Sequence, residues 1–136
     1  MKTQTMPPVE HRVCPAVSND ELNALFAASW PAHEPTDFAR KHAHGLAFVC
    51  AFVDERLIGY VNLAWDGGVH AFLLDTTVHP AHRRRGVGSD LVARAAVVAR
   101  ERGVRWLHVD FEPHLAGFYR GSGFGPTEAG LMWLGG

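Results

Sequence analysis

Three consecutive arginines, Arg83–Arg85, stand directly before two closely spaced glycines, Gly86 and Gly88. A guanidinium group is always charged and can donate two parallel hydrogen bonds to phosphate oxygens. Glycine carries no Cβ, so a bound group can approach the backbone closely at these two positions. The spacing therefore predicts a receptor for an anion, most naturally for phosphate groups.

This basic segment lies between a predicted strand and a predicted helix. The apolar stretch 69–78 ends in the β-branched residues Thr76, Thr77 and Val78, which is typical of a largely buried strand. Residues 89–102 repeat apolar side chains at helical spacing. The first turn of a helix leaves backbone N–H groups unpaired and carries a partial positive charge, so it favours an anion.

A dinucleotide site is a competing interpretation of the same glycines. Gly86 and Gly88, with Asp110 about twenty residues further on, imitate the Gly-x-Gly-x-x-Gly fingerprint. The third glycine of that fingerprint is Leu91 here, and the antiparallel hairpins predicted before the segment do not precede it in that fold. A nucleoside triphosphate loop is excluded because its Gly-Lys-Ser/Thr sequence is missing.

Nine histidines raise the question of a metal site. His79 and His82 form one candidate group, and His108, Asp110 and His114 form another. No four-ligand spacing stands out, and clusters arise by chance among so many histidines. The sequence therefore predicts no metal.

Length and composition predict one globular domain covering residues 1–136, with a loose start at 1–8. The hydrophobic fraction is 47% and the charged fraction 20%, and the formal net charge of −1 gives no reason to expect a nucleic-acid partner. Neither a signal-peptide core nor a membrane-length apolar stretch is present, so no membrane partner is expected. Cys14 and Cys50 are too few for a disulfide framework, which favours reduced thiols and a cytoplasmic protein.

The order of predicted elements is that of an α/β (α+β) domain. Residues 69–78 and 104–109, joined by a helix, predict a right-handed crossover and a central parallel strand pair. Ser18 and Glu21 predict a capping box at the start of the first helix. The whole is a mixed, mostly antiparallel sheet of six to seven strands with four helices. The strands are predicted at 11–17, 46–53, 57–65, 69–78, 104–109 and 131–134, and the helices at 19–30, 34–44, 89–102 and 113–120.

Two motifs, separated by one helix and one strand, resemble the GNAT superfamily of N-acetyltransferases. The first corresponds to the family's acyl-CoA pyrophosphate signature, and the second to its Phe-Tyr-x-x-x-Gly-Phe segment. The resemblance is specific over residues 72–124 and topological before them. The motifs are Arg83-x-x-Gly86-x-Gly88 and Phe118-Tyr119-Arg120-Gly121-Ser122-Gly123-Phe124.

The resemblance implies a GNAT-like sheet and acetyl-CoA as co-substrate. The backbone N–H groups of residues 84–89 would then bind the pyrophosphate. In such domains the two central parallel strands splay apart, and the pantetheine arm of the cofactor lies between them. The implied cofactor-binding residues are Thr76, Thr77, Val78, Arg83, Arg84, Arg85, Gly86, Val87, Gly88 and Ser89.

The activity that the resemblance implies is direct transfer of an acetyl group to a primary amine of a small molecule or a peptide chain end, within a ternary complex. Tyr119 corresponds to the family's general acid, which protonates the leaving thiolate. The alternative for Tyr119 is a packed aromatic side chain with a hydrogen-bonded hydroxyl. Family members often carry Glu or His at positions that match Phe72 and Leu74 here, so no base transfers from the family. The role of Asp75 stays open: it is either a base or a hydrogen-bonded structural residue.

Two further carboxylates, Asp110 and Glu112, can act through water, although Glu112 stands where many members have Asn. Simple alternation along 69–78 places Phe72, Leu74 and Thr76 on one face and Leu73, Asp75 and Thr77 on the other.

The acceptor is expected beside the hairpins and the helices at 30–45, with Trp30, Phe38, Trp65 and Phe72 as candidate lining residues. For each of these four aromatics a core position is the favoured alternative. Because domains of this family often dimerise, the resemblance also implies that a homodimer is possible. A non-catalytic acyl-CoA sensor or regulatory domain is the alternative, because no base is assigned.

Overall fold

A computed structural model of the chain describes residues 7–136, and most of the predicted loose start, residues 1–6, lies outside them. The described residues form one sheet with the strand order β1-β2-β3-β4-β5. The first four strands pair antiparallel, and β4 pairs parallel with β5, as predicted. The strands are β1 Glu10–Val13, β2 Gly45–Val53, β3 Arg56–Trp65, β4 His70–Val78 and β5 Trp106–His108.

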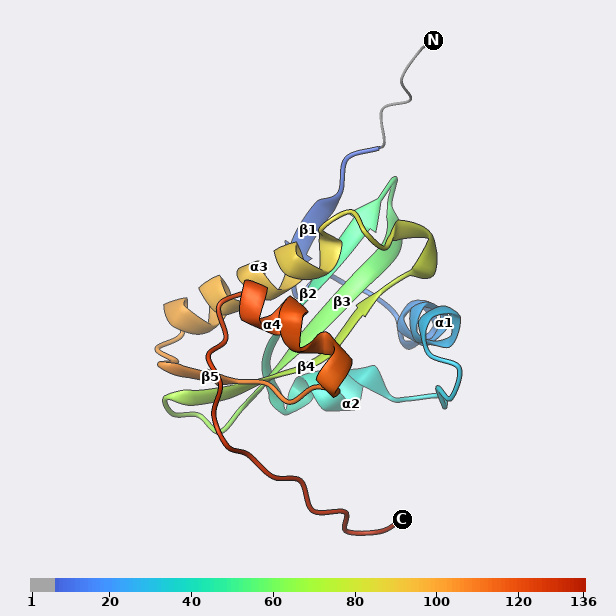
Figure 1. Cartoon of the computed structure of the whole chain (residues 1–136). Coiled ribbons are helices and arrows are strands. Elements are labelled where there is room, and N and C mark those ends of the chain that lie inside the picture. Colours follow the sequence, from blue (N-terminus) through green and yellow to red (C-terminus); the bar gives the residue numbers. More distant parts are fainter. Residues whose placement is uncertain (1–6) are drawn as a thin grey trace.

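Helices cover both faces of this sheet (Figure 1). The capping box predicted for α1 is present, because the Ser18 hydroxyl accepts from the Glu21 N–H and the Glu21 carboxylate accepts from the Ser18 N–H. One face is covered by α3 and the other by α1 and α2. The helices are α1 Asn19–Ser29, α2 Phe38–Ala43, α3 Val87–Glu101 and α4 Ala116–Gly121, with 3-10 turns η1 Pro80–His82 and η2 Pro113–Leu115.

Two apolar clusters, one on each face of the sheet, hold these layers together. On the α3 face, Leu91 and Ala95 pack against Val61, Leu63 and Leu73 of the central strands. On the other face, the clustered residues are Leu22, Leu25, Phe26, Phe38, Phe48, Cys50, Phe52 and Tyr60. Strands β2 and β3 are buried on both faces, which explains their nearly unbroken apolar sequence.

The described residues contain five strands rather than the six to seven predicted. The predicted last strand at 131–134 has no regular secondary structure, and its four residues are 82–87% exposed. An apolar segment forms a strand only when a neighbouring edge pairs with it, and none pairs here. The strands predicted at 11–17 and 104–109 shorten to Glu10–Val13 and Trp106–His108 because both lie at the edges of the sheet.

Two helix starts also differ from the prediction, for local reasons. The helix predicted at 34–44 begins at Phe38, where the Asp37 carboxylate caps it by accepting from the Arg40 N–H. Helix α3 begins at Val87 rather than Ser89, because Gly86 takes a left-handed conformation (φ 75°) and serves as the N-cap. Within residues 7–136, no helix is long and apolar enough to cross a membrane.

Candidate active site

The site is organised by a short parallel pairing between β4 and β5. Only His70–Phe72 of β4 pair with Trp106–His108 of β5, although β4 continues to Val78. Beyond Phe72 the two chain segments separate. Thr76 and Val78 then line one wall of a cavity of about 620 Å³, and Glu112 and His114 line another. The predicted splay of the central strands is therefore visible in the pairing register.

One end of the cavity is bounded by the bend that leads into α3. Arg84 (φ 64°) and Gly86 (φ 75°) both take left-handed conformations, which is typical of backbone turns that bind anions through their N–H groups. Within residues 7–136, no side chain caps the N-terminus of α3. Gly86, Val87, Gly88 and Ser89 all line the cavity, so unpaired N–H groups and the positive end of a fifteen-residue helix border it.

Gly88 lies at a tight contact between α3 and α4. A Cβ placed there would lie 3.2 Å from the Phe118 ring and 3.7 Å from a Val78 methyl group. The absence of a side chain lets Phe118 close against the first turn of α3. The two motifs singled out in the sequence therefore meet at this contact.

The three arginines have different tasks. Arg83 and Arg84 both line the cavity. The Arg83 guanidinium donates to the Val78 and Ser29 carbonyl oxygens, both at 3.3 Å, and so ties the end of β4 to α1. The Arg85 guanidinium binds the Pro7 carbonyl oxygen at 3.0 Å and His82 Nδ1 at 2.9 Å, and Arg85 is not among the lining residues. Arg84 is thus the arginine whose side chain is left to the cavity.

Tyr119 lies at the cavity wall with its ring held on three sides. The Phe111 ring stacks on it with centroids 4.8 Å apart, and Phe118 and Phe124 meet it edge to face. Its side chain is buried, and its hydroxyl lies 3.4 Å from Thr76 Oγ1. The hydroxyl is therefore fixed beside β4, at the part of the cavity where the strands separate.

A β-bulge in β4 decides which way the residues around Thr76 point. Asp75 and Thr76 together face one residue of β3, and Asp75 has a φ of 60°. The bulge overturns the simple alternation predicted for this strand. Thr76 contacts Tyr119 on the α4 side, whereas Asp75 and Thr77 point to the side of α1 and α2.

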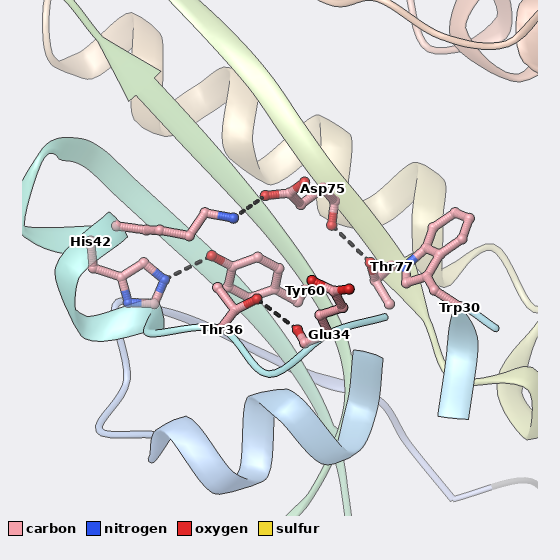
Figure 2. Close-up of polar contacts among 8 residues, drawn as sticks. Trp30, Glu34, Thr36, His42, Tyr60, Asp75 and Thr77 are labelled. Atoms are coloured by element: carbon pink, nitrogen blue, oxygen red, sulfur yellow. Dashed lines mark hydrogen bonds and ion pairs between the residues drawn. The ribbon is translucent and has the colours of Figure 1, made fainter. Parts of the chain in front are cut away.

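Asp75 and Thr77 are engaged in structural contacts on that side (Figure 2). The Asp75 carboxylate forms an ion pair with Lys41 of α2 at 2.9 Å. Thr77 is buried; its hydroxyl accepts from the Trp30 indole N–H at 3.0 Å and donates to the Asp75 carbonyl oxygen at 2.9 Å. Thr77 is consequently absent from the cavity lining, in contrast to Thr76 and Val78.

The comparisons with known proteins agree with this geometry. Residues 16–124 match the model of the acetyltransferase (GNAT) family. The chain belongs to that family. A solved GNAT-family acetyltransferase from Streptococcus pneumoniae superposes with a TM-score of 0.73 at 24% identity, covering 94% of this chain and 98% of that one. An aminoglycoside N-acetyltransferase in complex with CoA superposes at 0.77 and 21% identity, covering 97% of each chain. The predicted GNAT fold is confirmed.

The sequence relatives match over a smaller share of their own length than the solved structures do. A GCN5-related N-acetyltransferase of Arabidopsis thaliana, described as chloroplastic, is 27% identical over 126 residues, which are 90% of this chain and 64% of that protein. A mycothiol acetyltransferase of Brachybacterium faecium is 44% identical over 62 residues, 46% of this chain and 17% of that protein. The chain thus spans less than two thirds of the length of these relatives.

The acceptor-lining residues predicted for this GNAT domain separate into different environments. Trp30, at the end of α1, lines the cavity. Phe38 is 1% exposed and belongs to the core, which was the favoured of its two interpretations. Trp65 is half-buried and donates its indole N–H to the Gly68 carbonyl oxygen, and Phe72 is exposed on the sheet face near β5.

The histidines considered for a metal site are dispersed across the domain. The His79 and His82 rings lie 6.1 Å apart, while His108 pairs with His70 and His114 lines the cavity. Among residues 7–136, no group of three or more His, Cys, Asp or Glu side chains is placed to hold a metal ion.

Sequence reasoning missed a polar pair next to the Asp75–Lys41 ion pair. His42 Nε2 lies 2.7 Å from the Tyr60 hydroxyl (Figure 2). The His42 ring also stacks on Phe48, with centroids 3.7 Å apart. Burial, followed by the charge of Lys41, lowers the pKa of His42. Burial, followed by the charge of Asp75, raises the pKa of Tyr60. Both groups are therefore neutral near pH 7. The pair joins α2 to β3, so no local sequence pattern predicts it.

The lowered pKa of His42 predicts a loss of stability in mild acid. Its folded-state pKa lies below the usual 6.5, so the unfolded chain binds more protons there, and folding free energy is lost as the pH falls below that value. We expect His42→Gln to reduce the slope of the free energy of unfolding against pH, measured by urea titration between about pH 7.5 and 5.

Part of the slope should persist in this variant, because His11 and His82 also have lowered pKa values. An NMR titration of the His42 ring provides the direct reading. A midpoint at or above 6.5, or identical slopes for the two proteins, would contradict the assignment.

Proposed function

We propose that this protein is an N-acetyltransferase that moves the acetyl group of acetyl-CoA directly to a primary amine, in a ternary complex. One observation carries the proposal. A single cavity runs from the uncapped N-terminus of α3 to the Tyr119 hydroxyl, in the gap where β4 and β5 separate. An anion receptor and a proton donor thus border the same space.

Successive parts of the cavity lining suit successive parts of acetyl-CoA. The N–H groups from Gly86 to Ser89 and the Arg84 guanidinium suit the diphosphate. The free edge of β4 at Thr76 and Val78 suits the amides of a pantetheine arm, which can pair with it as a strand would. One superposing structure is a complex with CoA and another is a complex with a CoA-containing bisubstrate analogue, which supports this choice of co-substrate.

The transfer itself makes one C–N bond and breaks one C–S bond. The neutral amine nitrogen attacks the thioester carbonyl carbon, the thiolate leaves, and the ammonium proton of the intermediate must be removed. An alkylamine has a pKa of roughly 10, so only about one molecule in a thousand is neutral at pH 7, and a base is needed. The leaving thiol has a pKa of roughly 8.5, so a weak acid such as a tyrosine hydroxyl can protonate it.

Tyr119 is the proposed proton donor to the departing sulfur. Its ring is fixed by Phe111 and Phe124, and its hydroxyl lies beside Thr76 at the separation of the strands. A donor held in place before the reaction needs no reorganisation when negative charge develops on the sulfur.

Glu112 is the proposed base, acting directly or through a water molecule. Among the described residues that line the cavity, it alone carries a carboxylate. Its neighbour Phe111 stacks on Tyr119, so the Glu112 backbone is tied to the same end of the cavity. Asp75 is held by Lys41 instead, which assigns it to positioning the β4 bulge rather than to accepting a proton.

The acceptor is proposed to be a small amine or a flexible chain end that approaches beside Trp30. The aminoglycoside and mycothiol acetyltransferases among the similar proteins support a small polar acceptor. The alternative, a non-catalytic acyl-CoA sensor, is distinguished by measurement. CoA binding without thiol release across a panel of amines would favour the sensor.

Arg84 and Arg85 provide a matched pair for the cofactor assignment. We expect Arg84→Ala to weaken CoA binding about tenfold, roughly the 1.5 kcal/mol of one charge-assisted hydrogen bond. Arg85→Ala removes the same charge, but the Arg85 guanidinium is bonded to Pro7 and His82. We therefore expect this variant to change the Kd for CoA less than about twofold. Isothermal titration calorimetry measures both. Equal losses, or no loss in either, would refute the assignment of the bend.

Removing the Tyr119 hydroxyl tests the proton donor. We expect Tyr119→Phe to lower kcat by about a hundredfold with little change in the KM for acetyl-CoA, because the ring packing is kept. Thr76→Val is the control, since it removes the partner at 3.4 Å and leaves the acid. Thiol release followed with a chromogenic disulfide gives the rates. An unchanged kcat in Tyr119→Phe would remove the tyrosine from the mechanism.

A comparison of Glu112→Gln with Asp75→Asn tests the base. We expect Glu112→Gln to lower kcat/KM at least about tenfold and to abolish the acidic limb of the pH–rate profile. Asp75→Asn should keep that limb. If the limb instead disappears in Asp75→Asn and stays in Glu112→Gln, the two carboxylates have been assigned the wrong way round.

A further inference from the structure

The cavity is lined from both sides of the sheet. Most of its lining comes from the side of α3 and α4, where Thr76 faces Tyr119. Trp30 also lines it, although Trp30 stands at the end of α1 and donates its indole N–H to Thr77 on the opposite side. Because β5 pairs with β4 only as far as Phe72, the space beyond that residue connects the two sides. Trp30 therefore marks an entrance on the side of α1.

A carboxylate that the proposed transfer does not use points toward this entrance. Glu34 lies on the connection that follows α1, and Figure 2 shows its carboxylate pointing toward the part of β4 that carries Thr77. Glu34 is exposed, and in the part of the chain that the structure describes no cationic side chain forms an ion pair with it. Asp75 differs, because Lys41 already neutralises its carboxylate at 2.9 Å. Glu34 therefore places an unpaired negative charge beside the entrance.

The connection that carries Glu34 is fixed to α1 by Asn23. The Asn23 amide group donates to the Thr36 carbonyl oxygen at 2.9 Å, and the Asn23 side-chain oxygen accepts from the Thr36 N–H at 2.8 Å. His33 Nε2 lies 2.8 Å from the same oxygen. The Thr36 hydroxyl donates to the Glu34 carbonyl oxygen at 3.0 Å. The backbone on both sides of Glu34 is thus held in place, so a bound cation has to order only the side chain.

The Trp30 ring supplies a second surface that attracts a cation. Its indole N–H donates to the Thr77 hydroxyl at 3.0 Å, which fixes the ring, and the residue is 45% exposed. The face of a tryptophan ring attracts an ammonium group, because the π electrons make that face negative. A cation at this entrance therefore meets both a π face and a carboxylate.

We propose that the acceptor is a linear alkyl diamine, and that Trp30 and Glu34 bind the ammonium group that does not react. This inference rests on the proposed acetyl transfer and names its substrate class. One nitrogen of the diamine enters the cavity, loses its proton and is acetylated. The other nitrogen stays protonated at the entrance, because an alkylamine has a pKa of roughly 10.

The recognition site suits a small acceptor better than a protein. One carboxylate and one ring, four residues apart in the chain, provide contacts for a single cationic group. A protein acceptor would need an interface of roughly 800 Å² per partner. A methylene chain also crosses the space beside β4 without polar groups that need partners, whereas a peptide backbone carries one donor and one acceptor per residue.

Putrescine and n-butylamine provide a matched pair of acceptors. They share the reacting amine and the butyl chain, and they differ in the second ammonium group. With thiol release as the measurement, we expect kcat/KM for putrescine, corrected for its two equivalent amines, to exceed that for n-butylamine at least about fivefold through a lower KM. This ratio should decrease as the salt concentration rises, because salt screens an exposed ion pair.

Glu34→Gln tests the carboxylate at nearly unchanged shape. We expect the ratio of kcat/KM for putrescine to that for n-butylamine to fall severalfold in this variant, and further in Glu34→Lys, which reverses the charge. Glu101→Gln is the matched control. Glu101 is also exposed, but it is the last residue of α3, roughly 20 Å along the helix from the end that borders the cavity. Glu101→Gln should keep the ratio of the unaltered protein.

A binding measurement separates this inference from the proposed function. The NMR signal of the Trp30 indole N–H should shift when putrescine is added, with or without CoA, and should shift much less in Glu34→Gln. If this shift occurs but no amine is acetylated, the proposed transfer fails and the diamine site stands. If both amines are acetylated equally and Glu34→Gln changes nothing, the transfer stands and the diamine site is refuted.

Two further results would overturn the diamine site. One is the absence of the Trp30 shift at every putrescine concentration measured. The other is acetylation of a lysine-containing peptide with a higher kcat/KM than putrescine, which would mean that the acceptor is a peptide chain.

Discussion

The limited pairing of β4 with β5 is the constraint on which the site depends. Two parallel strands that stay in register leave no space between them, whereas these two pair over three residues only. The crossover through α3 fixes where β5 begins, and the bulge at Asp75 bends β4 after the paired part. The unpaired edge of β4 is then exposed to the cavity, which a ligand with amide groups can satisfy.

The entry into α3 concentrates positive potential without a buried cation. A left-handed conformation costs a residue such as Arg84 about 1 kcal/mol, and Gly86 nothing comparable. In return, N–H groups and the helix dipole converge on the same end of the cavity. The three arginines have separate roles: Arg83 joins β4 to α1 and Arg85 binds the Pro7 carbonyl oxygen, which leaves the Arg84 side chain to the cavity.

Much of this site was predictable because its parts are local in sequence. The strand, the bend and the helix follow one another between Ala71 and Glu101, so periodicity and two glycines were sufficient to place them. The task of Arg85 was not predictable, since its partner Pro7 is 78 positions away. The bulge at Asp75 was missed for a similar reason, because it is a mismatch between two strands. The strand predicted at Leu131–Leu134 does not form. Its composition is typical of a strand, but no neighbouring strand pairs with it.

The bulge needs support from the opposite side of the sheet, and α2 supplies it. Asp75 in a left-handed conformation is held by Lys41, the next residue His42 bonds to Tyr60, and Tyr60 pairs with Thr77 directly after the bulge. Thr77 in turn binds Trp30 and the Asp75 carbonyl oxygen. Each contact fixes a residue adjacent to Thr76 and leaves Thr76 itself to face Tyr119. The polar side chains behind β4 thus determine how its front edge meets the cavity, although none of them lies in it except Trp30.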